Sequence, residues 1–305
     1  MIDATLLGVM DKFGSEDKCR EYLETLRWPE GVTCPRCKSK SVSQIVKRSQ
    51  YDCNDCRYQF SVKAGTIFND SHLPLTKWFL VTYLICESRK GMSANQIKRM
   101  IGGSYKTSWY LCHRIRAAMK EVEKPMLTGT VEIDETYVGG RRRGCGPGPA
   151  NSGNKEIVIG IRQRGGDLRF IRANNLKAET LYQMIHDNVS EEVEVLVTDE
   201  YRTYKHAMGS TFKDKHQTVN HKKGEYVRGD VYTNTVESAF SLLKRGIMGT
   251  WHRVSVKHLP AYLDEMTFRF NRRKSPYLFQ DTLRHMVTAS VLTFETLTSE
   301  KASAA

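Results

Sequence analysis

The chain has 305 residues, of which 40% are hydrophobic and 27% are charged, as in a globular protein with a buried core. Its 47 lysines and arginines outnumber its 34 acids, and the formal net charge of +13 favours a polyanionic partner, with nucleic acid preferred over a membrane surface. No apolar run approaches the roughly 20 residues of a membrane span, and residues 1–4 carry no signal-peptide pattern, so we expect a cytoplasmic protein without a membrane partner.

The first predicted element is a helix within an N-terminal helical segment, residues 1–30. Ser15 is typical of a helix cap, and the two acids that follow it complement the positive end of the helix dipole. Apolar residues then recur at helical spacing as far as Trp28, which is followed by a proline. The sequence therefore predicts a helix from about residue 16 to residue 27.

Two CxxC pairs, separated by 15 residues, predict a zinc ribbon over residues 31–71. Four thiolates on two tight turns complete the tetrahedral shell of one structural Zn²⁺. The predicted zinc ligands are Cys34, Cys37, Cys53 and Cys56. The remaining cysteines are scattered, and we expect them to be reduced thiols that pack as small hydrophobic side chains. These are Cys19, Cys86, Cys112 and Cys145.

Residues 72–125 have the outline of a helix-turn-helix. A helix is expected on each side of Gly102-Gly103, and the eight lysines and arginines between Arg89 and Lys120 are accompanied by no acid. This segregation of charge favours a recognition helix in a DNA groove, and the alternative is an ordinary helical hairpin with a solvated basic face. The predicted DNA contacts are Lys98, Arg99, Lys106, Arg114 and Arg116.

From residue 126 the pattern changes to strands alternating with helices, which predicts a mixed α/β domain over residues 126–280. Residues 130–138 form the first strand, and Gly165-Gly166 marks a hairpin turn between the next two. A helix and a further strand, residues 193–199, follow. A C-terminal helix and tail over residues 281–305 complete a fold of the mixed, α+β class.

Three carboxylates in this domain have the pattern of a site for divalent metal ions. Asp134 interrupts a β-rich strand, Asp199 ends a later one, and Glu237 lies on an amphipathic helix. Carboxylates that converge from two strands and a helix match the ligands that two Mg²⁺ or Mn²⁺ ions require for phosphoryl transfer. Each acid also has an ordinary interpretation: Glu237 as a solvated helix residue, and Asp199 as a helix cap.

Basic and polar side chains surround these acids in the sequence. The helix that carries Glu237 gathers Asn234, Ser241, Lys244 and Arg245 on the same polar side. Lys222 and Lys223 lie in a basic segment after a short strand, where contact with DNA competes with the interpretation as an ordinary basic loop. We add Lys222, Lys223 and Arg245 to the predicted DNA contacts.

Several of these motifs resemble those of insertion-sequence transposases of the IS1595 type, which join a zinc ribbon to an ISXO2-like DDE domain. The likeness covers residues 10–275. The stretches that carry it are Arg27 to Cys37, Gly65-Thr66-Ile67-Phe68, Glu132-Ile133-Asp134-Glu135-Thr136-Tyr137-Val138-Gly139-Gly140, Thr198-Asp199, Thr233-Asn234-Thr235-Val236-Glu237, Leu243-Lys244-Arg245 and Arg269-Phe270-Asn271-Arg272-Arg273.

The resemblance implies an RNase H-like core in which Asp134 and Asp199 bind catalytic Mg²⁺ or Mn²⁺. The third ligand is Glu237 or Asn234; a carboxylate binds Mg²⁺ better than an amide does, which favours Glu237. Lys244, two helical turns beyond Glu237, is placed to grip a terminal phosphate.

The function that follows from the resemblance is transposition. Such a protein, in the bacterial nucleoid, binds the terminal inverted repeats of its element, cleaves the ends and joins their 3′-hydroxyls to target DNA. Synapsis of two ends implies a homodimer or higher oligomer. Two other functions remain open: a non-catalytic zinc-ribbon and helix-turn-helix regulator derived from a transposase, and a stand-alone nuclease.

Overall fold

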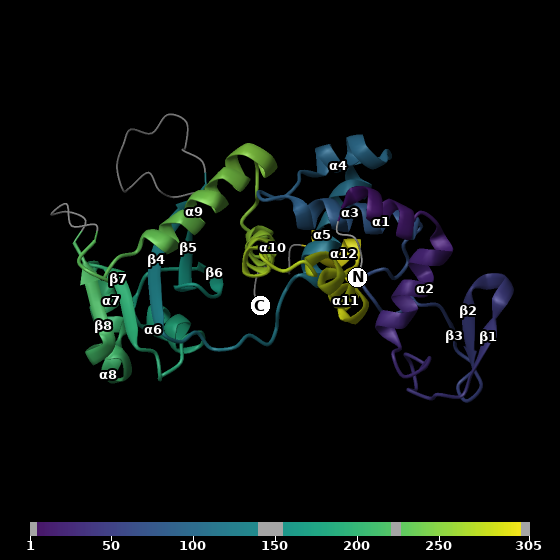
Figure 1. The fold of residues 1–305 in the computed structure, drawn as a ribbon, viewed down its shortest axis with the longest axis horizontal. Helices are drawn as coiled ribbons and strands as arrows, with labels where there is room; N and C mark the ends of the chain where they lie inside the picture. Colours follow the sequence, from purple (N-terminus) through teal and green to yellow (C-terminus); the bar gives the residue numbers. More distant parts are fainter. Residues whose placement is uncertain (1–4, 140–154, 221–226, 300–305) are drawn as a thin grey trace. The chain divides into compact units, whose positions relative to one another are not determined.

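The computed structural model describes residues 5–139, 155–220 and 227–299 of the chain. The chain divides into two compact units. The first comprises Met1–Lys120 together with Arg272–Ala305, and the second comprises Glu121–Asn271 (Figure 1). Among the described residues, no helix combines the length and the hydropathy that a membrane span needs.

The first unit is built mainly from helices. The serine predicted as a cap performs that role: Ser15 accepts a hydrogen bond from the backbone N–H three residues later, and Ser93 and Ser104 cap α4 and α5 in the same way. The helices are α1 (Leu6–Lys12), α2 (Glu16–Arg27), α3 (Leu75–Glu87), α4 (Ala94–Ile101), α5 (Tyr105–Ala118), α11 (Leu278–Thr288) and α12 (Phe294–Thr298). The predicted helix over residues 16–27 is thereby confirmed, and helices lie on both sides of Gly102-Gly103 as expected.

A small antiparallel sheet in the order β1-β2-β3 carries the cysteine pairs. Its strands are β1 (Val42–Ile45), β2 (Gln50–Cys53) and β3 (Gln59–Phe60), with a 3₁₀ turn at Val46–Arg48. The ring of Trp28, at the end of α2, packs edge-on against those of Tyr51 and Phe60. The Arg27 guanidinium donates to the carbonyl oxygens of Val62 and Ala64, at 2.6 and 2.7 Å. These contacts attach the ribbon to α2.

The C-terminal segment packs on the helices of the first unit. Helix α11 lies against α2, α3 and α5, and the ring of Phe279 lies 6.2 Å from Phe13 and 5.8 Å from Tyr83. The hydroxyl of Thr282 is 3.3 Å from the Cys86 thiol. The sequence predicted a C-terminal helix and tail over residues 281–305 but not this packing, because contacts between residues almost 200 positions apart leave no local signal.

The second unit contains a five-stranded mixed sheet in the order β6-β5-β4-β7-β8. The β6-β5-β4 pairs are antiparallel, and the β4-β7 and β7-β8 pairs are parallel. The strands are β4 (Thr130–Val138), β5 (Glu156–Gln163), β6 (Leu168–Ala173), β7 (Val195–Asp199) and β8 (His216–Val219). The helices are α6 (Ala178–His186), α7 (Arg202–Ala207), α8 (Gly209–Phe212), α9 (Asn234–Gly246) and α10 (Leu259–Asn271), with a 3₁₀ turn at Lys213–Lys215 and a π-helical turn at Ile247–Trp251. The predicted mixed α+β class is confirmed.

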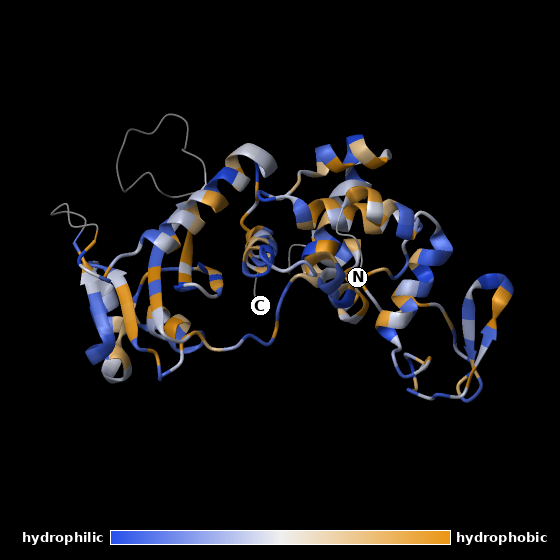
Figure 2. Cartoon of the chain, in the orientation of Figure 1, coloured by the Kyte–Doolittle hydropathy of each residue, from blue (hydrophilic) through white to orange (hydrophobic). Residues whose placement is uncertain are grey.

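Each face of this sheet packs against its own set of helices. Ile133 and Leu196 point toward α6, α7 and α8, whereas Val158 and Phe170 point toward α9 and α10. Hydrophobic and hydrophilic segments alternate along α9 in Figure 2, as expected of an amphipathic helix lying on a sheet. Gly160 of β5 allows α9 to approach closely, because a Cβ atom there would lie 2.7 Å from the Phe240 ring.

Candidate active site and zinc site

Asp134 and Asp199 occupy equivalent positions on adjacent parallel strands. The ladder between β4 and β7 pairs Thr130 with Val195 and continues to Glu132 with Val197, an offset of 65 positions. Asp134 and Asp199 have the same offset, two positions beyond the last pair. Because side chains alternate along a strand, both aspartates project from the face that carries α9.

The surroundings of Asp134 resist its ionisation. Burial, followed by the charge of Glu135, raises the pKa of Asp134 to about 7, and the carboxylates of Asp199 and Glu237 raise it further. A hydrogen bond from the Glu135 N–H, 2.8 Å long, partly offsets these effects. Asp134, Asp199 and Glu237 thus lie close enough to interact electrostatically. They form a local excess of negative charge of the kind that a divalent cation relieves.

Glu237 and Asn234 differ in their surroundings on α9. Glu237 is half-buried, and its Oε1 accepts a 2.9 Å hydrogen bond from the Thr233 hydroxyl, whereas Asn234 is exposed at the first position of the helix. Asp199 has a second role as well, because its Oδ1 accepts from the N–H of Tyr201 at 3.0 Å. That bond is an Asx turn rather than the predicted helix cap, since α7 begins at Arg202.

Glu132 ties the start of α9 to β4, a role the sequence analysis did not predict. Its side chain is fully buried, and one oxygen accepts from the Arg164 Nε at 2.7 Å. The other accepts from the backbone N–H groups of Thr235 and Val236, both at 3.0 Å, and from the Thr235 hydroxyl at 2.7 Å. This carboxylate therefore caps α9 two residues before Asp134 and fixes the helix that carries Glu237.

Arg164 extends this connection to the segment that precedes α9. Its remaining nitrogens donate to the carbonyl oxygens of Asp230 and Tyr232 at 2.6 and 2.9 Å, and its guanidinium lies 3.6 Å from the centre of the Tyr232 ring. The sequence offered one signal for the role of Glu132: it lies two residues before Asp134, on the same face of the strand. A glutamate buried there requires hydrogen-bond partners.

A second buried contact lies on the opposite face of β4. The Tyr204 hydroxyl donates to Glu135 Oε2 at 2.7 Å, and Tyr204 belongs to the core between the sheet and helices α6 to α8. Burial is the largest effect that raises the pKa of Glu135 and of Tyr204. Alternation along β4 separates this pair from the face that carries Asp134.

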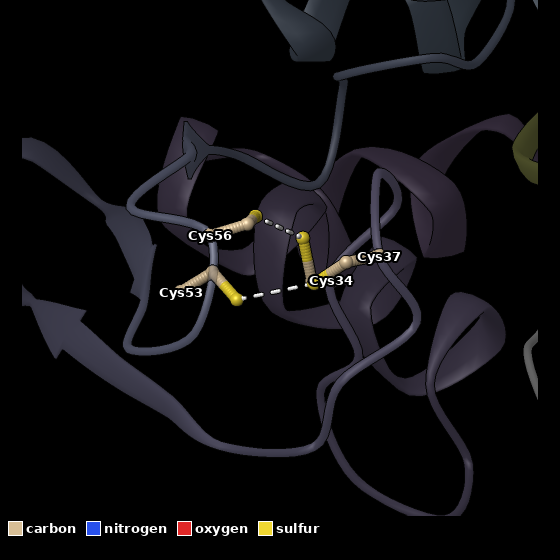
Figure 3. A group of neighbouring side chains, drawn as sticks. All are labelled: Cys34, Cys37, Cys53 and Cys56. Carbon is tan, nitrogen blue, oxygen red and sulfur yellow. Dashed lines mark hydrogen bonds between the residues drawn. The ribbon is translucent and has the colours of Figure 1, made fainter.

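The four predicted zinc ligands lie together (Figure 3), with their sulfur atoms within 4.8 Å of one another. The Sγ atoms of Cys34 and Cys56 are 3.7 Å apart, and those of Cys37 and Cys53 are 3.4 Å apart. A tetrahedral Zn²⁺ with Zn–S bonds of about 2.3 Å separates its ligands by about 3.8 Å, so this geometry fits the ion.

Both CxxC turns have the same backbone geometry. The residue that follows each pair adopts a left-handed conformation, with φ of 64° at Lys38 and 57° at Arg57, and its N–H donates to the carbonyl of the first cysteine. Burial opposes ionisation of Cys34, but backbone N–H groups and neighbouring thiols lower the pKa of Cys34 to about 7. A thiol of this kind ionises readily on metal binding.

The acids are arranged differently from the cysteines. Within residues 5–139, 155–220 and 227–299, the cysteine cluster alone brings three or more His, Cys, Asp or Glu ligand atoms this close together. Asp134, Asp199 and Glu237 are therefore not gathered around one point. Their oxygen donors still suit hard divalent cations, and a pair of ions spreads its ligands over a wider space than a single ion does.

The predicted DNA contacts of the first unit separate into two groups. Lys98, Arg99 and Lys106 are exposed on α4 and α5. Arg114 and Arg116 are only 3% and 2% exposed, which argues against the predicted phosphate contacts, because α5 turns this side inward. Burial also lowers the pKa of Arg114.

The remaining predicted contacts belong to the second unit. Lys244 and Arg245 are exposed on α9, and the Arg245 Nε donates to the Ser241 carbonyl at 3.1 Å. Lys222 and Lys223 lie outside the described residues, as does Cys145. Cys19, Cys86 and Cys112 are buried thiols outside any disulfide bond, as predicted.

Comparison with known proteins identifies the family. Residues 126–271 match the model of the ISXO2-like transposase domain, and residues 14–59 match that of the transposase zinc-ribbon domain. The chain is also 32% identical over 274 residues to the "Uncharacterized protein in transposable element ISH50" of Halobacterium salinarum, covering 84% of this chain and 91% of that protein. The chain belongs to the IS1595-type transposase family.

Family membership agrees with the two sites described above. The zinc-ribbon match includes all four clustered cysteines, which indicates structural zinc. The ISXO2-like match includes Asp134, Asp199 and Glu237 and ends at the last residue of α10. The chain is thus an insertion-sequence transposase whose two family domains coincide with the cysteine cluster and the mixed sheet.

Proposed function

We propose that this transposase binds the terminal inverted repeats of its element, cleaves the ends and joins their 3′-hydroxyls to target DNA. The observation that carries the proposal is the shared register of Asp134 and Asp199 on adjacent strands beneath the helix that bears Glu237. The mixed five-stranded sheet supports the RNase H-like core that the family resemblance implies.

In this proposal Asp134, Asp199 and Glu237 hold two Mg²⁺ or Mn²⁺ ions. When bound, such ions lower the pKa of an attacking water or hydroxyl and neutralise charge on the phosphate. Asp134 and Asp199 supply oxygen ligands from neighbouring strands. Asp134 is half-buried, and Glu132 fixes the start of α9 so that Glu237 keeps its position.

Glu237 is the better candidate for the third ligand. Its charge raises the pKa of Asp134, so the two carboxylates share one electrostatic environment. Asn234 is exposed, and its neutral amide supplies no charge to balance that of the ions. The Thr233 hydroxyl, which donates to Glu237 Oε1 at 2.9 Å, helps to hold the carboxylate in orientation.

The exposed cations provide the contacts with DNA. Lys244 lies seven positions after Glu237, on the same side of α9, and with Arg245 it binds phosphate near the reacting bond. Lys98, Arg99 and Lys106 bind the element ends through the two helices joined at Gly102-Gly103. The zinc ribbon adds a second DNA-binding module. Because two element ends must be paired, the active form is a homodimer or higher oligomer, and it acts at the nucleoid.

The experiment that tests this function follows a labelled element end incubated with the purified protein, target DNA and Mg²⁺. We expect cleavage and joined product with the wild type. Asp134→Ala should reduce joining by more than about a thousandfold while DNA binding persists. Glu192→Ala, at an exposed acid of the same unit, is the matched control.

Two outcomes would contradict the proposal. Cleavage without joined product would identify a nuclease. Binding of the ends without any divalent-ion-dependent chemistry would identify a regulator derived from a transposase.

A further inference from the structure

A pocket of about 520 Å³ lies in the first unit beside the first turns of α5. Its walls come from α3, α5, α12 and the segment before α3. Its lining includes three large aromatic rings, two cations, an imidazole and an acid: Trp78, Tyr110, Phe294, Lys106, Arg114, His72 and Asp70. The volume lies within the range of small-molecule sites and exceeds that of a single nucleobase.

Arg114 is an unusual lining residue because it is 97% buried without an ion-pair partner among the described residues. Its Nη2 donates to the Asn69 carbonyl at 2.6 Å, while its Nε is buried without a hydrogen-bond partner. The guanidinium lies between two rings, 5.1 Å from the centre of Trp78 and 5.2 Å from that of Tyr110. A guanidinium has five N–H donors, so this side chain has donors left for an acceptor in the pocket.

The aromatic residues favour a planar ligand. Tyr110 and Phe294 pack edge to face with their centroids 5.5 Å apart, and Tyr110 is fixed by a hydrogen bond from its hydroxyl to the Leu292 carbonyl. Lys106 Nζ lies 4.2 Å from the centre of the Phe294 ring and is exposed. The pocket therefore combines ring faces with an accessible positive charge, which together suit a base and its phosphate.

We propose that this pocket binds one unpaired nucleobase of DNA. The base ring stacks on Tyr110 and Phe294, its carbonyl or ring-nitrogen acceptors face Arg114, and the adjacent phosphate lies near Lys106. The proposal rests on the DNA-binding function proposed above. It also explains why a buried arginine occurs on a helix that carries exposed DNA contacts: a base outside the stack can enter a pocket that a duplex phosphate cannot.

The test uses the full-length protein and two duplexes of the same sequence. One has a single extrahelical base, and the other has an abasic residue at that position, so that both have the same phosphates. At matched salt we expect the wild type to bind the first about tenfold more tightly. Phe294→Ala should bring the ratio of the two affinities close to one. Lys106→Gln should lower this ratio by a smaller factor. The matched controls are Tyr105→Ala and Lys18→Gln, at an exposed aromatic residue and an exposed cation of the same unit that do not line the pocket, and they should keep the ratio.

A second measurement needs no variant. A photoreactive base at the unpaired position should cross-link wild-type protein at Tyr110, Trp78 or Phe294, as identified by mass spectrometry. Equal affinity for the two duplexes, or cross-links only outside the pocket, would overturn the proposal. Failure to bind either duplex would instead refute the DNA-binding function itself, and the pocket proposal with it.

Discussion

Asp134 lowers the stability of the folded protein and is also a proposed ligand of the metal ions. Aspartate is disfavoured in strands, and here it is also partly buried near three other carboxylates. A residue of this kind destabilises the metal-free protein when it ionises. The cost falls when a divalent ion shares the charge, so the same residue connects folding stability to metal binding.

We predict a pH dependence of stability that originates from Asp134. Its pKa is about 7 in the folded chain and 3.8 in the reference state, so the folded protein holds this proton more tightly than the unfolded chain does. Stability should therefore fall as pH rises from about 4 to 7, by at most about 4 kcal/mol. Denaturant unfolding at pH 5 and pH 8, in metal-depleted buffer without chelator, measures this change.

Two comparisons separate Asp134 from other titrating groups. Asp134→Asn should flatten the decrease between pH 5 and pH 8, whereas Asp214→Asn, at an exposed acid, should retain it. Millimolar Mg²⁺ should restore stability at pH 8 in the wild type but not in Asp134→Asn. An unchanged pH dependence in Asp134→Asn would show that this carboxyl is not the responsible group.

Individual side chains were predicted best where the chemistry is local. Ser15 and Ser93 cap helices because the hydroxyl and its N–H partner lie three positions apart, which the sequence displays directly. The burial of Arg114 and Arg116 was not predicted, because basic residues are usually exposed and their burial depends on how α5 packs. Charge composition identifies a basic helix but does not identify which cations face solvent.

At the scale of elements, the position of α9 depends on a few contacts. Its start is held by the Glu132 carboxylate, and its middle approaches β5 closely because Gly160 has no side chain. The position of α9, and with it that of Glu237, therefore depends on contacts with β4 and β5. A change that releases the start of α9 should alter the site as well as stability.

We predict that Glu132→Ala destabilises the protein by about 3 to 5 kcal/mol. The substitution removes a buried partner of Arg164 and leaves the N–H groups of Thr235 and Val236 without their acceptor. Denaturant unfolding of the full chain measures the loss. Glu156→Ala is the matched control, because it breaks a half-buried pair with Arg172 in the same sheet and should cost less than about 1 kcal/mol. Equal losses in the two variants would contradict the role assigned to Glu132.

The elements themselves follow closely from sequence patterns. The strand expected over residues 130–138 is β4, and the helix beginning at Asn234 has the predicted buried and polar sides. The capping of α9 by Glu132 was not predicted because its partner Thr235 is 103 positions away. Periodicity predicts which face of an element is buried, but not which element covers it.

At the scale of the whole molecule, the chain combines a cysteine-stabilised module and a mixed-sheet unit. The ribbon is attached to α2 by the Arg27 and Trp28 contacts, so metal loss should affect it more than the remaining helices. The return of Arg272–Ala305 to the first unit was beyond sequence analysis, because no motif marks it. The four clustered cysteines, in contrast, followed from the spacing of the CxxC pairs, and the family followed from the resemblance of several motifs.

We predict one tightly bound Zn²⁺ per chain, which Cys37→Ser should release. Elemental analysis of the purified protein measures the metal, and circular dichroism should show that most helical content persists. DNA affinity should fall because the ribbon no longer folds. Cys86→Ala, at a buried cysteine outside the cluster, should retain the zinc. Full zinc content in Cys37→Ser would contradict the four-cysteine site.

The most direct test of the central claim is the anomalous diffraction signal of Mn²⁺ in crystals of the full-length protein. We predict manganese peaks in contact with the carboxylates of both Asp134 and Asp199, with Glu237 as a further ligand, and loss of these peaks in Asp134→Asn. Manganese bound only at other positions, or a second unit that takes up none at saturating concentration, would contradict the claim.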